Sequence, residues 1–184
     1  MRKIVHYVHI SIDGFVEGPN GEFDWPVMST ELSDFSLALT ERADTFLYGR
    51  VVWEMMSSYW PQAESHSDHP HDLAFAPVWR ETAKVVVSST LEAADWNTTV
   101  LNSAESLAAL KQQDGGDILL TGGAGLAASL EDLGLLDEWH IVVHPLTLGG
   151  GKRLFTEGTP RRTATLLESR SLDNRVAHLH HSLL

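Results

Sequence analysis

Several segments of the chain have the hydrophobic pattern of β-strands. β-Branched and aromatic residues dominate in them, and glycine or polar residues end most of them. The predicted strands are residues 3–12, 45–48, 84–89, 99–101, 118–121, 138–144, 164–172 and 175–183. Asp173-Asn174 has the composition of a tight turn, so the last two strands are predicted to form an antiparallel hairpin.

Amphipathic segments separate the strands in the first two-thirds of the chain. Leu32, Phe35 and Leu39 fall on one face at helical spacing, and Ser29 or Thr30 can cap the helix that they predict. Further helices are predicted over residues 51–57, 103–113 and 124–133. Proline and histidine are frequent between residues 58 and 77, which predicts an irregular segment with at most a short helix over 74–79.

The order of these elements predicts an α/β fold. Strands that alternate with helices imply right-handed crossovers and a mostly parallel sheet, and the C-terminal hairpin implies an antiparallel edge. A length of 184 residues is typical of one domain with its own hydrophobic core. We therefore expect a single domain over residues 1–184.

Glycine or polar residues follow three of the predicted strands. The turn Gly122-Gly123-Ala124-Gly125 comes after Thr121, Gly49-Arg50 follows the second strand, and Ser88-Ser89 ends the third. Ligands of open α/β sheets bind at the carboxyl ends of the strands, where helix N-termini offer bare N–H groups to phosphate. Together these turns favour a phosphorylated nucleotide as the ligand. The alternative is that the glycines serve only the turn and that Arg50 pairs with Glu54.

The first strand leads into an aromatic and acidic loop. Phe15, Phe23 and Trp25 could cover a planar ring, and the carboxylates of the loop could anchor a substrate or supply a proton. We expect four residues to face the substrate, with Asp24 or a bound water as the proton source. These residues are His9, Asp13, Asp24 and Trp25.

The ten histidines also allow a metal-dependent hydrolase. His66, His69 and His71 crowd one segment, but the prolines there favour a solvated loop over a fixed ligand set. The pairs His140/His144 and His178/His180 each share one face of a strand, and we expect them to be half-buried and hydrogen-bonded. The sequence therefore predicts no metal site.

Charge and composition restrict the possible partners. The formal net charge of −12 opposes general binding to nucleic acid or anionic membranes. The chain has no cysteine, its N-terminus lacks the apolar core of a signal peptide, and no apolar run approaches the length of a membrane span. We expect a cytoplasmic protein whose exposed C-terminal hairpin is covered in a homodimer.

The same segments, in this order and spacing, resemble the dihydrofolate reductase fold. The matching stretches are Ile12-Asp13, the loop to Trp25-Pro26, Tyr48-Gly49-Arg50-Val51-Val52-Trp53-Glu54, Val86-Val87-Ser88-Ser89 and Thr121-Gly122-Gly123. The stretch from Leu119 to Phe155, which includes Leu148-Gly149-Gly150-Gly151-Lys152-Arg153-Leu154-Phe155, is similar to one branch in particular. That branch contains the reductase domain of the bifunctional riboflavin-biosynthesis deaminase-reductase and its stand-alone relatives.

This resemblance implies a three-layer fold and an NADPH-dependent reductase that acts on a small heterocyclic or carbonyl substrate. The residues that it places against the cofactor are Gly49, Arg50, Val51, Val52, Ser88, Ser89, Thr121, Gly122, Gly123, Ala124 and Gly125. Folate reductases carry an acidic residue shortly after the loop tryptophan, whereas Glu31 and Asp34 are out of register here, which argues against dihydrofolate as the substrate. The alternative on the same fold is a nucleotide-binding sensor domain without catalytic activity.

Overall fold

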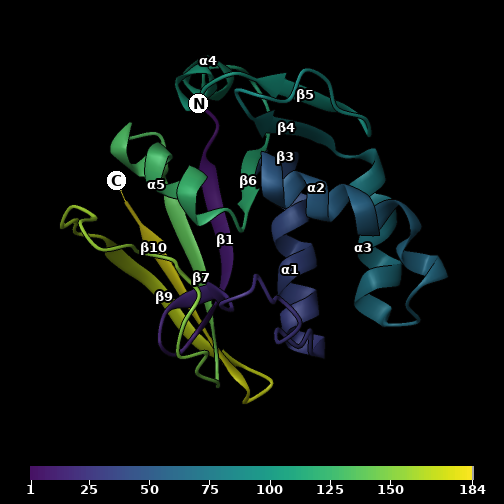
Figure 1. Ribbon diagram of the computed structural model, residues 1–184, viewed down its shortest axis with the longest axis vertical. Helices are drawn as coiled ribbons and strands as arrows, with labels where there is room; N and C mark the ends of the chain where they lie inside the picture. The colour runs from purple at the N-terminus through teal and green to yellow at the C-terminus, as the bar shows by residue number, and fades with distance from the viewer. Residues whose placement is uncertain (184) are drawn as a thin grey trace.

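The computed structural model describes residues 1–183, and a sheet of eight strands runs through its centre (Figure 1). The strand order is β5-β4-β3-β6-β1-β7-β10-β9. The bounds are β1 Ile4–Ser11, β3 Ala43–Gly49, β4 Ala83–Val87, β5 Thr98–Leu101, β6 Asp117–Thr121, β7 Glu138–His144, β9 Thr165–Leu172 and β10 Val176–Ser182.

The sheet is parallel from β5 to β7 and antiparallel beyond it, where β10 pairs with β7 and β9 pairs with β10. This confirms the predicted mixed α/β architecture. β1 lies in the middle of the sheet, with Val5 opposite Leu119 on one side and opposite Glu138 on the other. The first strand therefore pairs only with strands that come more than a hundred residues later in the chain.

Helices cover both faces of the sheet. They are α1 Thr30–Arg42, α2 Arg50–Tyr59, α3 Pro70–Glu81, α4 Leu107–Lys111 and α5 Ala124–Asp132, with short 3₁₀ segments at Trp60–Ser65 and Ala104–Ser106. Alternate residues of the strands face opposite layers, so Val5 packs with α1, α2 and α3, whereas Ile4 packs with α4 and α5. The result is the expected three layers.

Within residues 1–183, none of the helices combines the length and the apolar composition needed to cross a bilayer.

The segment before β4 is more regular than the sequence predicts. The short helix expected over 74–79 is in fact α3, which begins at Pro70. Proline suits this first position because the N–H that it lacks has no intrahelical partner there, and the His69 ring accepts a hydrogen bond from the backbone N–H of His71. Trp79 is fully buried on the inner face of α3 and donates to the hydroxyl of Tyr48 at 3.2 Å.

A two-stranded ribbon lies outside the strands that the sequence predicts. β2 (Phe15–Glu17) pairs antiparallel with β8 (Lys152–Arg153). The guanidinium of Arg153 lies 4.4 Å from the centre of the Phe15 ring. Strands this short carry no periodic pattern, so sequence periodicity cannot reveal them.

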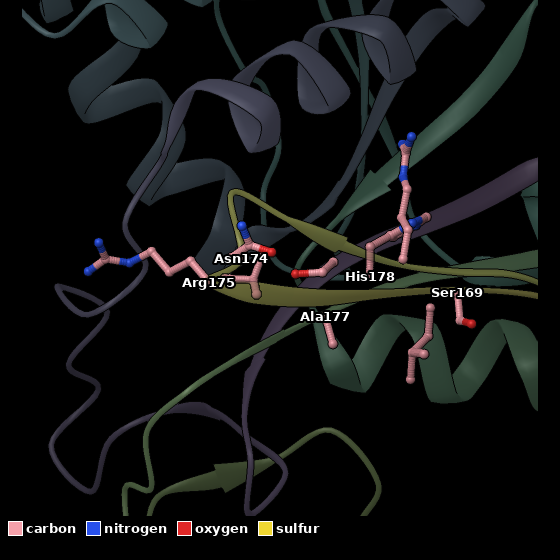
Figure 2. Close-up of a pocket in the computed structure, with 9 residues that line it drawn as sticks. Ser169, Asn174, Arg175, Ala177 and His178 are labelled. Carbon is pink, nitrogen blue, oxygen red and sulfur yellow. The ribbon is translucent and has the colours of Figure 1, made fainter.

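The C-terminal hairpin supplies the cap of α1. Asp173 and Asn174 have φ values of 53° and 50°, as a two-residue hairpin turn requires, and the predicted turn is confirmed. Ser29 occupies the N-cap position, but its side chain makes no cap hydrogen bond. The Asp173 carboxylate instead accepts the N–H of Glu31 at 2.8 Å. The turn itself is labelled through Asn174 and Arg175 in Figure 2.

Candidate functional site

Two helix N-termini lie side by side at the carboxyl edge of the sheet. β3 and β6 are neighbours, Gly49 leads from β3 into α2, and Gly123 leads from β6 into α5. A Cβ built on Gly49 would lie 3.9 Å from Leu126, and one on Gly123 would lie 3.9 Å from Val52. The structure therefore brings together two of the three turns that the sequence identifies.

Neither helix is capped by a side chain. Gly49 and Gly123 are the N-cap residues, so the first N–H groups of both helices have no side-chain acceptor. Gly122 and Gly123 have φ values of +63° and +68°, which explains why both are glycine. Two helix dipoles with uncapped N–H groups make this edge suitable for an anionic group such as phosphate.

The side chain of His6, on β1, holds the glycine turn in place. Its Nε2 lies 2.8 Å from the carbonyl oxygen of Gly122, and the N–H of Gly122 donates to the carbonyl of Tyr7 at 3.0 Å. Burial lowers the pKa of His6 to about 4, so the ring is neutral near pH 7 and carries its proton on Nε2 to make this bond. His6 carries no sequence motif that marks it as part of a site, and only its place on β1 beside β6 reveals this role.

Arg50 is at the first position of α2, and its guanidinium bonds the carboxylate of Glu54 at 2.8 and 3.0 Å. This is the pairing that the sequence offers as the alternative to a phosphate contact. Both side chains are nearly half exposed, and Val51 beside them is exposed. An exposed pair of this spacing stabilises a helix by only about 0.2–0.5 kcal/mol, so Arg50 can exchange Glu54 for a ligand at small cost.

The serine turn follows β4, the neighbour of β3. Ser88 is buried, and its hydroxyl accepts the N–H groups of Thr90 and Leu91 at 3.2 and 3.0 Å, so it stabilises the turn itself. Ser89 is exposed. Val87 lies opposite Gly49 in the sheet, so this turn flanks the N-terminus of α2. Of the two hydroxyls, that of Ser89 is the more accessible.

An aromatic cluster lies beyond the end of β6, and we define it as His9, Phe23, Trp25 and His144. The distances between ring centres are 5.1 Å for His9 to His144, 5.4 Å for Trp25 to His144, 5.5 Å for Phe23 to Trp25 and 6.5 Å for His9 to Phe23. Tyr7 pairs with the last residue of β6, so His9 lies just past that end, next to the glycine turn. A flat substrate placed here would meet ring faces and edges.

His9 and His144 form a neutral pair. Nδ1 of His9 lies 2.8 Å from Nε2 of His144. Burial, together with repulsion from His144, lowers the pKa of His9 to about 3, and burial lowers the pKa of His144 to about 4. One N–H is therefore shared between two uncharged rings near pH 7. The sequence predicts His9 in the site, but it does not reveal this partner on β7.

The two loop carboxylates have different surroundings. Asp13 accepts hydrogen bonds from the Ser11 hydroxyl at 2.6 Å and from the N–H groups of Leu148 and Gly149 at 3.1 and 2.8 Å. These bonds, led by that of Ser11, lower the pKa of Asp13 to about 2, so it is ionised and anchors the loop before β8. Asp24 is exposed beside Trp25. Its position allows proton exchange with solvent.

Comparison with known proteins identifies relatives along the whole chain. The RibD C-terminal domain family matches residues 2–178. YyaP of Bacillus subtilis strain 168, described as uncharacterized, is 32% identical over 182 residues, which cover 97% of this chain and 93% of YyaP. YwjB of the same strain, also described as uncharacterized, is 27% identical over 183 residues, which cover 98% of this chain and 97% of YwjB.

Solved structures share the fold. A putative riboflavin biosynthesis protein from Shewanella sp. PV-4 matches with a TM-score of 0.74 and 21% identity, covering 98% of each chain. Dihydrofolate reductase from Enterococcus faecalis, solved in complex with NADP(H), matches with a TM-score of 0.66 and 14% identity, covering 98% of this chain and 95% of that one. The family resemblance inferred from the sequence is confirmed, and the chain belongs to the RibD C-terminal domain family.

Proposed function

We propose that the protein is an NADPH-dependent reductase that transfers hydride to a small heterocyclic or carbonyl substrate. The observation that carries this proposal is the pair of glycine-capped helix N-termini beside the aromatic cluster. The helix N-termini fit the phosphates of a dinucleotide, and the aromatic cluster fits the stacked rings of the nicotinamide and the substrate. The family and its fold are related to reductases, and the enterococcal neighbour is described in complex with NADP(H).

In this proposal, the cofactor extends along the carboxyl edge of β4, β3 and β6. The N–H groups around Gly49 and Gly123 bind the pyrophosphate, and the guanidinium of Arg50 binds the 2′-phosphate that distinguishes NADPH from NADH. Ser89 lies at the adenosine end. The nicotinamide lies against the turn from Thr121 to Gly125, which His6 holds in place.

Bound NADPH would supply the hydride, and the residues of the chain orient the substrate. His9 and His144 offer a neutral N–H to a carbonyl or ring nitrogen, while Phe23 and Trp25 exclude water from one side of the ring. Because neither imidazole is charged near pH 7, the proton comes from solvent or from Asp24 at the mouth of the site.

The test uses two glycines with the same backbone strain. Gly123 has φ +68° at the N-terminus of α5, and Gly134 has φ +64° just after its C-terminus. Replacing either with Ala costs about 1–2 kcal/mol, because left-handed backbone is unfavourable for a side chain. Gly123→Ala should also weaken NADPH binding in a fluorescence titration, whereas Gly134→Ala should not. Equal NADPH affinity in both folded variants would contradict the cofactor site.

A sensor without turnover is the second candidate. It is favoured by Asp13, whose carboxylate anchors a loop and stays ionised near pH 7, so that Asp13 has no proton to give to a substrate. NADPH binding without oxidation across a panel of pterins, pyrimidines, quinones and aldehydes would support the sensor. Substrate-dependent loss of NADPH absorbance would support the reductase.

A further inference from the structure

A second group of titratable side chains lies away from the carboxyl edge. We call Glu138, His140, His178 and His180 the histidine cluster. Glu138 is the first residue of β7 and pairs with Val5 of β1, so it marks the amino end of the parallel strands. Glu138 and His140 lie on β7 and the other two on β10, with His140 directly opposite His180, and all four side chains lie on one face of the sheet. Figure 2 shows His178 on the face of the hairpin opposite to that of Ala177.

Three of these side chains have the spacing of metal ligands. Glu138, His140 and His180 each offer one ligand atom, and these atoms all lie within 4.8 Å of one another. Oε2 of Glu138 lies 3.0 Å from Nε2 of His180 and 3.8 Å from Nε2 of His140. Tetrahedral ligands about 2.0–2.1 Å from Zn²⁺ lie roughly 3.3 Å apart, and the two observed distances lie on either side of that value.

His140 points an unbonded nitrogen at this centre. The residue is only 3% exposed, and its Nε2 makes no hydrogen bond. Its Nδ1 lies 3.0 Å from Nε2 of His178. If Nδ1 of His140 donates that bond, the Nε2 lone pair faces the Glu138 carboxylate. If Nδ1 of His140 accepts that bond, the proton is on Nε2, which at 3.8 Å is too far from the Glu138 carboxylate to form a hydrogen bond. Either arrangement leaves a buried polar atom unsatisfied, which is costly without a cation.

The surrounding groups are arranged as an outer shell. Nζ of Lys3 donates to Oε1 of Glu138 at 2.6 Å, and the other carboxylate oxygen, Oε2, faces the histidines. His178 bonds the ring nitrogen of His140 that faces away from the centre. Metal-binding carboxylates and imidazoles characteristically have such partners.

We propose that Glu138, His140 and His180 bind a divalent transition-metal ion of the zinc type at the amino end of the sheet. Two imidazoles and one carboxylate oxygen suit Zn²⁺ and leave a fourth position for water. The His140 and His180 rings are stacked with their centres 3.9 Å apart, so metal binding requires both rings to turn about Cβ–Cγ until their Nε2 atoms converge on the ion. The ion joins β7 to β10 and is independent of the reductase proposal.

The test uses the full chain without a histidine tag. Zn²⁺ titrated by calorimetry should bind at about one ion per chain, and excess Zn²⁺ should raise the melting temperature because it binds the folded state. Co²⁺ should give the visible absorption of a four-coordinate site. Glu138→Gln, His140→Gln and His180→Gln should each weaken Zn²⁺ binding roughly 100-fold, the upper end of the effect of outer-shell changes.

The matched control is His181→Gln, the next residue of β10, which lies on the opposite face and should bind Zn²⁺ as the wild type does. The double variant His66→Gln/His69→Gln tests the exposed histidines before α3. Should a cluster variant fail to fold, paramagnetic shifts from Co²⁺ in the wild type identify the ligands directly. No saturable binding, ligation by His66 or His69, or unchanged affinity in the cluster variants would overturn the proposal.

Discussion

Arg50 is the residue on which the proposed preference for NADPH depends. Its guanidinium bonds only Glu54 among the contacts described for it, in an exposed pair of low strength. Arg50→Ala should weaken NADPH binding roughly 10- to 100-fold, the range of a charged hydrogen bond, and should leave NADH binding unchanged. Arg80→Ala, which breaks a similar exposed pair with Glu64, is the control. An equal loss for both nucleotides would exclude a 2′-phosphate contact.

His6 connects the core to the glycine turn. His6→Leu removes the bond to the Gly122 carbonyl and should lower the free energy of unfolding by about 1–3 kcal/mol, the cost of leaving a buried acceptor unpaired. It should also weaken NADPH binding, because the turn is no longer fixed. Urea unfolding and a nucleotide titration measure the two effects. Full NADPH affinity in the folded variant would limit His6 to a role in stability.

Among the elements, α1 depends on a cap that comes from the other end of the chain. Asp173→Ala should destabilise the protein by about 1 kcal/mol, as the loss of an N-cap does, and lower its melting temperature. Ser29→Ala changes the residue that the sequence suggests as the cap, and it should leave the melting temperature nearly unchanged because its hydroxyl makes no cap bond. A larger loss of stability for Ser29→Ala than for Asp173→Ala would identify Ser29 as the cap of α1.

The elements that the sequence predicts well are those with a long periodic pattern. The buried strands, the hairpin turn and the helices after Ser29 and Gly123 are confirmed close to their predicted bounds. Periodicity is weak where prolines interrupt it, so α3 is longer than predicted. It is absent in the two- and three-residue strands of the ribbon.

The candidate site was predictable only where a motif marks a strand end. Gly49, Gly122 and Gly123 follow hydrophobic runs, and the parallel topology then brings their turns to one edge. The pairing of His9 with His144 depends on the register of β1 against β7, and no local sequence pattern determines the register of two strands so far apart in the chain. The different surroundings of Asp13 and Asp24 likewise depend on tertiary contacts with residues 148 and 149.

For the whole molecule, the buried histidines make stability depend on pH. Burial is the leading cause that lowers the pKa of His6, His9, His140, His144 and His178 from 6.5 to about 3 or about 4. At pH values between these folded-state pKa values and 6.5, the unfolded chain therefore binds more protons than the folded chain. Stability is full above about pH 6.5 and is lost as the pH falls toward about pH 4. Urea midpoints that stay constant across this window would contradict the prediction.

The outer strand also leads us to propose a homodimer. β9 ends the sheet, and its side chains Leu166 and Leu167 are 54% and 52% exposed. A long edge strand of this kind invites pairing with a second copy. Light scattering should give the mass of a dimer, and the double change Leu166→Glu/Leu167→Glu should give a monomer. Leu73→Glu, at an exposed position of α3, is the control.

The cap that Asp173 provides for α1 can form only late in synthesis. α1 leaves the ribosome early, but its N–H groups wait for a turn that is made about 140 residues later. β1 likewise waits for β6 and β7 before it has any neighbour. At roughly 5–20 residues per second, β1 and the N-terminus of α1 stay without these partners for about 6–30 s. We expect nascent chains that end before β7 to remain sensitive to protease and to engage chaperones.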